Sequence, residues 1–193
     1  MANKVKFGLS NVHIAKITQT TNSSGNPVIT YGTPFAVPGA VSLTLDPEGD
    51  SSDFFADNTV YFRDSTNNGY SGSLEIALIP DDFRTNILGE TLDSNGALIE
   101  NKDDKLSDFA LGFQLEGDET GRKYWYYQVT PSRPSNSSQT TETSKTPVTD
   151  TLNIKASTRI TDGQVRAFME DKGTNTTEYN NFFTTVYETT VSA

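Results

Sequence analysis

The chain contains no cysteine and only one histidine in 193 residues. Without cysteine, disulfide bridges, thiolate nucleophiles and zinc–thiolate centres are excluded. With His13 as the single imidazole, the usual nucleophile–histidine triads and histidine-rich metal sites cannot be assembled in the ordinary way. His13 stands between Val12 and Ile14 in an alternating pattern, which favours a strand residue at the surface or a sheet edge. We therefore expect neither an enzyme nor a bound cofactor.

Basic residues are also scarce, with 15 Lys and Arg against 25 Asp and Glu and a net charge of −10. They are scattered and mostly have an acid nearby, as in Arg63-Asp64 and Lys102–Lys105. Tight binding of nucleic acid needs clustered cations, so it is not expected. No apolar run is long enough to cross a membrane, and the N-terminus has no hydrophobic leader. We expect a soluble protein that is made in a cytoplasm.

The residues that are present favour a folded, mainly β protein. Aromatic residues make up 10% of the chain, with eleven Phe and eight Tyr, which argues against disorder. The length fits a single domain over 1–193. Alternation with a period of two predicts a sandwich or barrel of about eight short strands. The alternating segments are 5–7 and 12–17 (broken near Gly8), 41–45, 60–62, 74–78, 109–115, 124–129, 152–156 and 165–169.

One segment within this pattern predicts a flanking α-helix over 81–88. Asp81 can cap the first turn, and Phe83 and Ile87 fall on one face at a spacing of four residues. Gly89 is a favourable residue for ending the helix. We expect the helix to pack on the sheet through Phe83, Ile87 and Leu88.

A second, shorter helix is predicted at about 176–187, near the C-terminus. Asn175 with Glu178 three residues later resembles a capping box. The apolar residues Tyr179, Phe182, Phe183 and Val186 have the spacing of an amphipathic stripe. Tyr179, Phe182 and Phe183 are the expected packing residues.

Long loops are predicted at 46–58 and 131–146. The first is acidic and contains two adjacent phenylalanines; its candidate interaction residues are Asp46, Glu48, Asp50, Asp53, Phe54, Phe55 and Asp57. Closely spaced carboxylates are what calcium requires, but their order does not match an EF-hand loop, and a solvated acidic loop is favoured. Asp81-Asp82 and Asp103-Asp104 could be read as catalytic carboxylate pairs. A helix cap and a charged loop explain these pairs better, so no enzyme emerges.

The aromatic strand Tyr124–Tyr127 has two interpretations. Alternation places Tyr124 and Tyr126 on one face and Trp125 and Tyr127 on the other. Either an exposed face binds carbohydrate, or one face lies in the core and the other packs on a helix or a second subunit. The packing interpretation is favoured, and a carbohydrate- or receptor-binding β-sandwich remains the alternative function.

Several segments form a recognisable set: Ala36–Leu45, Asp53–Tyr61 and Gly72–Phe83, together with the opening Val5–His13 and the closing Phe182-Phe183. They resemble the major tail proteins, or tail-tube proteins, of siphophages that infect Gram-positive bacteria. The resemblance covers about residues 4 to 188, and the strand-to-helix junction Ile79–Phe83 is its most specific part. The segment 131–146 has no counterpart in it.

The resemblance implies a structural virion protein with a tail-tube-like sandwich. Subunits of this family form hexameric rings that stack into a tube through which DNA passes without specific binding, and a loop at the position of 46–58 bridges successive rings. The implied partners are further copies of the chain, the tape-measure protein, and the tail initiator and terminator. Assembly would take place in the host cytoplasm and the final location would be the phage tail.

Overall fold

The computed structural model describes residues 3–140 and 147–189 and is built mainly of antiparallel β-strands with two short helices. This confirms the predicted mainly-β sandwich with few helices. Within the described ranges, no helix is long and apolar enough to cross a membrane. The elements in chain order are β1 Lys6–Thr21, β2 Pro27–Tyr31, β3 Phe35–Ala36, β4 Ala40–Glu48, β5 Ser51–Ala56, β6 Thr59–Ser65, β7 Gly69–Ile76, α1 Asp81–Phe83, the π-helical turn η1 Arg84–Leu88, β8 Thr91–Leu92, β9 Leu98–Ile99, β10 Phe109–Gly117, β11 Arg122–Pro131, β12 Asp150–Ser157, β13 Arg166–Met169 and α2 Thr176–Asn180.

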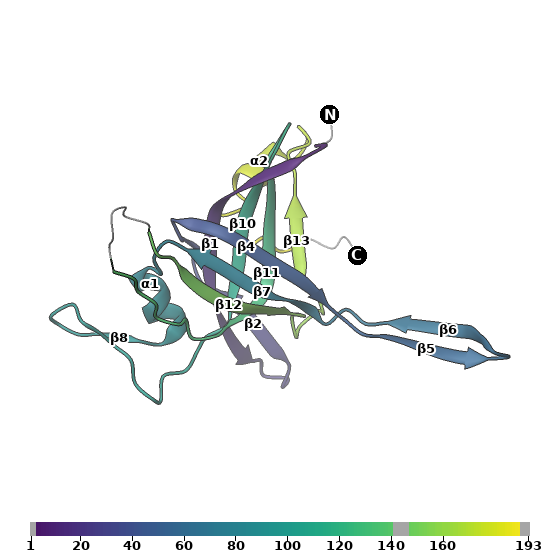
Figure 1. Cartoon of the computed structure of the whole chain (residues 1–193), viewed down its shortest axis with the longest axis horizontal. Helices are drawn as coiled ribbons and strands as arrows, with labels where there is room; N and C mark the ends of the chain where they lie inside the picture. Colours follow the sequence, from purple (N-terminus) through teal and green to yellow (C-terminus); the bar gives the residue numbers. More distant parts are fainter. Residues whose placement is uncertain (1–2, 141–146, 190–193) are drawn as a thin grey trace.

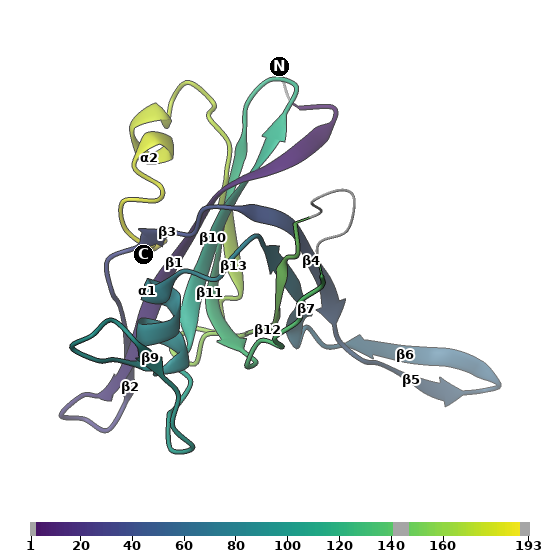
Figure 2. The same cartoon turned by 60° about the vertical axis from the view of Figure 1, so that its left-hand side comes forward.

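One curled sheet forms the body, in the order β2-β1-β10-β11-β12-β7-β4, with β13 paired to β11 and β3 paired to β1. The strand β11 is where the sheet divides, because residues 123–126 pair with β13 whereas residues 128–131 pair with β12. Beyond this division β12, β7 and β4 turn back across the inner face of β1, β10 and β11 (Figure 2). The two halves therefore face each other as the layers of a sandwich.

Two hydrophobic clusters lie on opposite faces of β1, β10 and β11. The inner cluster fills the space between the two halves of the sheet and includes Ile14, Leu74, Leu111 and Leu152, with Phe83 from α1 packed at its side. The outer cluster contains Trp125, Tyr127 and Phe182, so the C-terminal segment covers the opposite face. Alternation in β11 thus divides its aromatic rings between two cores, as the pattern predicts.

The predicted break near Gly8 is wrong, because β1 runs without interruption for 16 residues. Its pairing with β10 shifts register between Phe7 and Leu9 and again between Ser10 and His13. Gly8 and Asn11 have positive φ angles of 54° and 51° at these two points. A β-bulge absorbs an extra residue without ending the strand, which a simple alternation pattern cannot distinguish from a break.

The predicted α-helix over 81–88 is α-helical only at Asp81–Phe83 and continues as the π-helical turn η1. The predicted cap is also wrong: Asp81 lies inside the first turn, the N-cap position is Pro80, and no side chain caps this end. The end of the helix agrees with the prediction, since Gly89 is left-handed with φ 82°. The side chains of Phe83, Ile87 and Leu88 are buried against the sheet.

The predicted C-terminal helix ends early, at Asn180 rather than near 187. The capping box does not form, because Asn175 instead accepts a hydrogen bond from the Lys172 amide and donates one to the Glu170 carbonyl. Beyond the helix, the carbonyl of Phe182 accepts from the Trp125 indole N–H at 2.7 Å. Side chains of β11 therefore bind backbone groups that a longer helix would have used.

The two predicted loops differ in outcome. The 46–58 loop is wrong: β4 continues to Glu48, and β5 and β6 form a hairpin that turns at Asp57-Asn58. Of the 131–146 loop, Pro131 ends β11 and residues 132–140 have no regular structure. Residues 141–146 lie outside the described residues.

Candidate assembly surface

Nearly every residue of the β-hairpin formed by β5 and β6 is exposed. A two-residue turn closes it, with φ 52° at Asp57 and 59° at Asn58. Positive φ at both central positions is the geometry of a type I′ turn, which suits the twist of a tight hairpin and favours Asn, Asp and Gly. The hairpin forms a separate two-stranded sheet and projects away from the body (Figures 1 and 2).

The hairpin carries apolar side chains on its exposed surface. Phe54 is 61% exposed, Phe55 63%, Tyr61 74% and Phe62 60%, and Val60 lies beside them at 44%. An isolated two-stranded hairpin is at best marginally stable in water, and contiguous exposed apolar groups mark interaction sites. The hairpin is therefore suited to binding another surface.

The acidic residues predicted as candidate interaction residues lie along this hairpin and its base. Asp53 receives two hydrogen bonds from Arg63 across the strands, at 2.6 and 2.9 Å. These bonds hold the pKa of Asp53 below its usual value. Glu48, at the base, pairs with Lys155 at 2.7 Å, and this contact lowers the pKa of Glu48.

The remaining predicted carboxylates do not converge on a metal. Asp46 lies in β4, Asp50 precedes β5, and Asp57 is at the opposite end of the hairpin in the turn. Within residues 3–140 and 147–189, no group of three or more candidate ligand side chains could hold a metal ion. The structure thus spreads these acids along an extended arm.

A cleft opens on the inner side of the sandwich, where β4 and β7 face β1, β10 and β11. It has a volume of about 230 Å³ and is bordered by Leu43 and Leu45 on one side. On the other side, the ring of Phe113 stacks on Tyr124 at 4.9 Å and on Tyr126 at 6.0 Å. The cleft therefore combines aromatic rings with polar groups, and the rings of Phe113 and Tyr126 are largely buried beneath it.

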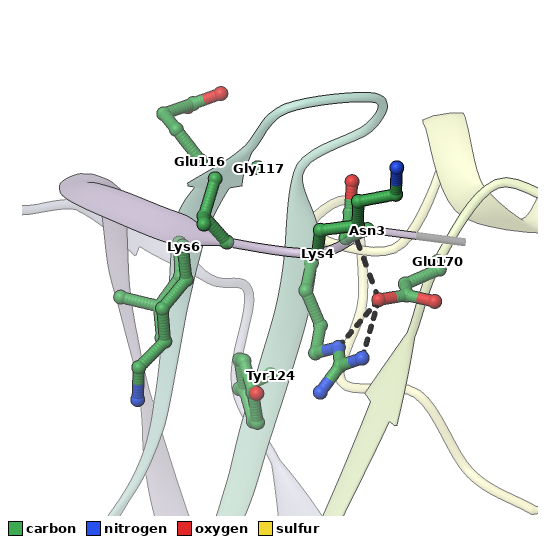
Figure 3. A pocket seen from close by; sticks show the side chains of 10 residues that line it. Asn3, Lys4, Lys6, Glu116, Gly117, Tyr124 and Glu170 are labelled. Atoms are coloured by element: carbon green, nitrogen blue, oxygen red, sulfur yellow. Dashed lines mark hydrogen bonds and ion pairs between the residues drawn. The ribbon is translucent and has the colours of Figure 1, made fainter. Parts of the chain in front are cut away.

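A second pocket, of about 310 Å³, adjoins the cleft and shares Lys6, Leu115 and Tyr124 with it. Figure 3 shows Lys6 and Tyr124 on the same side of the N-terminal segment, with Asn3 and Glu170 closing the other end. The two pockets form one groove, which we call the inner groove.

Both cations and carboxylates line the inner groove, the carboxylates being those of Glu116 and Glu170. Arg166 lies over the rings of Tyr70 at 5.1 Å and Tyr126 at 5.9 Å, and donates to the Tyr126 hydroxyl. Of the six arginines, Arg166 is the one without a carboxylate partner among the described residues. Lys4 and Lys6 also line the groove and are exposed.

The outer face of β11 is closed by the C-terminal segment. Trp125 and Tyr127 are fully buried, so they are not available as a carbohydrate platform. Phe182 is buried against them, and Phe183 contacts Trp125 edge-on at 5.8 Å. Tyr179 is half-buried, and the Lys123 amine lies 4.0 Å above its ring.

His13 differs from its predicted surface or edge position. It is half-buried and stacks on the Phe183 ring at 4.7 Å, while its backbone pairs with both β10 and β3. This places His13 in the packing of the C-terminal segment.

An ion-pair cluster fastens the end of the C-terminal segment to the sheet. Arg159 is 5% exposed and binds Asp162 and Glu188, with hydrogen bonds of 2.8 and 2.9 Å to the latter. Its guanidinium lies 4.4 Å from the centre of the Tyr127 ring. A buried guanidinium requires such partners because an unpaired buried charge is costly.

Comparison with known proteins adds no family assignment: a scan against protein-family models finds no match, and a search of the curated proteins finds none either.

Sequence reasoning found the acidic and aromatic residues of β5 but missed the hairpin and the groove. Val60 and Phe62 resemble ordinary strand residues, although they lie in β6, the second strand of the exposed hairpin. The Asp57-Asn58 pair between two β-prone runs is the signal that predicts a hairpin. The inner groove has no comparable signal, because it combines residues from six strands.

Proposed function

We propose that this protein is the major tail-tube subunit of a siphophage, which assembles with copies of itself into rings that stack to form a tube. The observation that carries this proposal is the β5–β6 hairpin, which extends apolar side chains from the body and pairs with no other strand of the described chain. This arm supports the role that the resemblance implies for residues 46–58. The protein would thus act by assembly, with no chemical step.

The shape of the molecule favours repeated, head-to-tail contacts. A contact between the hairpin of one copy and the body of another joins two different patches. Contacts of that kind generate closed rings or open helical stacks, whereas a contact between identical patches stops at a dimer. A tube of stacked rings is one such assembly.

The charge of the chain also supports a conduit for DNA. A net charge of −10 on each subunit would give a tube with a repulsive wall, along which phosphates slide without binding. On this proposal the subunit is located in the phage tail. Its further partners are the tape-measure protein, an initiator complex and a terminator, and the ring is sixfold as the resemblance implies.

Electron microscopy of concentrated protein tests the proposal. We expect wild-type protein to form rings or hollow tubes, and Phe54→Ser/Phe62→Ser protein to remain monomeric while keeping its circular dichroism spectrum. Ile160→Ser is the matched control, because Ile160 is 58% exposed but lies outside the hairpin. Tubes of normal length and number from the hairpin variant would refute the assembly role of the hairpin.

A further inference from the structure

The chain contains two Asn-Gly dipeptides, Asn68-Gly69 and Asn95-Gly96, and the structure holds them in different ways. Asparagine followed by glycine is prone to spontaneous loss of ammonia, because no side chain shields the backbone nitrogen that follows the asparagine. Both pairs share this intrinsic chemistry. A difference between their reactivities in the folded protein must therefore come from the tertiary structure.

The Asn95-Gly96 pair lies in the turn that joins β8 to β9. Asn95 and Gly96 are both exposed, and a Cβ added at Gly96 would meet no atom within 4 Å. The Gly96 amide donates a hydrogen bond of 3.1 Å to the Asp93 carbonyl. β8 and β9 are joined by two residue pairs in a small sheet of their own, on a segment that projects beside α1 (Figure 1). This turn can therefore open without disturbing the large sheet.

The Asn68-Gly69 pair is held by the large sheet. Gly69 is buried at the start of β7, where it pairs with Glu48 of β4. The Asn68 amide donates to the Glu48 carbonyl at 2.8 Å, and the Gly69 amide donates to the side chain of Asn67 at 3.1 Å. A Cβ at Gly69 would lie 2.0 Å from the Ala156 carbonyl oxygen, so the backbone of β12 packs directly on this residue. Rotation of the peptide between residues 68 and 69 would disrupt this packing and pairing.

We propose that Asn95 is a site of spontaneous deamidation in the folded protein, and that the large sheet protects Asn68 from the same reaction. In this reaction the backbone nitrogen of Gly96 loses its proton and attacks Cγ of Asn95. The bond from Cγ to Nδ2 breaks, ammonia leaves with the proton, and a succinimide ring forms. Water from the solvent then opens the ring at either carbonyl, which leaves aspartate or isoaspartate at position 95. No oxidant or reductant is required.

The modification alters a turn that depends on the carboxylate of Asp93. Its Oδ1 accepts hydrogen bonds from the amides of Asn95 at 2.9 Å and Ala97 at 2.7 Å. The side-chain nitrogen of Asn95 donates to Oδ2 of the same carboxylate at 3.5 Å. Deamidation replaces that donor by an anion, so two negative charges then repel each other across the turn. The site is separate from the β5–β6 hairpin, so the inference does not depend on the proposed assembly.

Peptide mapping of aged protein tests the site. Folded protein is incubated in mildly alkaline buffer and sampled over time, and a sample at time zero corrects for reaction during digestion. Tryptic cleavage after Arg63, Arg84 and Lys102 puts the two asparagines on separate peptides, whose fragment masses locate the change from amide to carboxylate. We expect Asn95 to react at least about tenfold faster than Asn68, because the turn opens more readily than the sheet. Similar rates at the two positions, or a faster reaction at Asn68, would overturn the proposal.

Protein unfolded in urea is the control for local sequence. The two asparagines should then react at rates within about threefold of each other, because the sheet no longer protects Asn68. If the tenfold difference persisted in urea, the neighbouring residues rather than the fold would be its cause, and the proposed protection would be wrong.

Asn95→Asp tests the expected effect on the turn. Hydrogen exchange of the Ala97 amide should become about twofold faster than in the wild type, because the second carboxylate weakens the turn. Asn136→Asp is the matched control, since Asn136 is also exposed but lies outside this turn. Unchanged exchange in Asn95→Asp, or an equal change in the control, would contradict repulsion within the turn.

Discussion

Substituting Phe182 by alanine should destabilise the monomer strongly without affecting the hairpin. Phe182 is 1% exposed and packs in the outer cluster beside Trp125 and Val186. Its ring also contacts Tyr187 at 5.4 Å. Removing a fully buried phenylalanine side chain costs about 3–5 kcal/mol, because transfer free energy is lost and a cavity remains.

The expected loss of unfolding free energy in Phe182→Ala can be measured by urea denaturation. For a domain of this length the urea dependence of the unfolding free energy is roughly 2–3 kcal/mol/M, so the unfolding midpoint should fall by roughly 1–2.5 M. The chain has a single tryptophan, Trp125, which is fully buried under Phe182, so its fluorescence reports the transition. The indole of Trp125 donates to the backbone carbonyl of residue 182, a group that the substitution does not remove, so the variant tests mainly the packing contribution.

Phe54→Ala is the matched control for this experiment. The same change at a side chain that is 61% exposed should alter monomer stability by no more than about 0.5 kcal/mol, while it impairs assembly. The reasoning is refuted if Phe182→Ala costs less than about 1 kcal/mol, or if the two variants lose equal stability. Either result would mean that the C-terminal segment does not cover the outer face of β11.

Three further outcomes are expected. Gly69→Ala should lower the unfolding free energy by more than about 2 kcal/mol in the same urea assay, since φ is +100° and a Cβ would lie 2.0 Å from the Ala156 carbonyl oxygen; a smaller loss would contradict this close approach. The hydrogen bonds from Arg159 lower the pKa of Asp162, so their stabilisation is present above the unfolded-state pKa of about 4 and is lost as the pH falls through the folded-state pKa. In thermal melts the stability gap between wild type and Asp162→Asn should therefore be wide at neutral pH and narrow in acid, and a constant gap would exclude the ion pair as its cause. A chelator should leave the melting temperature unchanged, since Asp53 pairs with Arg63 and the other acids of 46–57 are spread along the hairpin; a lower melting temperature would revive the calcium site.

The element types could be predicted from local patterns because those patterns reflect burial on one face of a strand. Alternation in residues 124–127 assigns Tyr126 to one core and Trp125 to the other, as the structure shows. The same local logic placed Phe83 and Ile87 on one buried face and Gly89 at the end of the turn. In each case the deciding contacts involve neighbours within a few residues or a single apolar face.

Contacts between distant segments decided the features that local patterns did not predict, such as the end of the C-terminal helix. The stripe from Tyr179 to Val186 has helical spacing, but the indole of Trp125 and the hydroxyl of Tyr127 bind carbonyls of this segment, and the helix ends at Asn180. These donors lie more than 50 positions away in the chain, so no local pattern contains them.

The sequence by itself determined most strands of the large sheet, the two faces of β11 and the acidic, cysteine-free character of the chain, because these properties depend on residue chemistry and short-range spacing. Only the tertiary structure decided that β5 and β6 form an exposed hairpin apart from the large sheet, since whether a hairpin pairs with a third strand depends on which segments lie beside it. The same holds for the inner groove, where Arg166 meets Tyr70 across nearly a hundred residues of sequence. Its cation and its aromatic lining come together only when the sheet divides at β11 and curls back on itself.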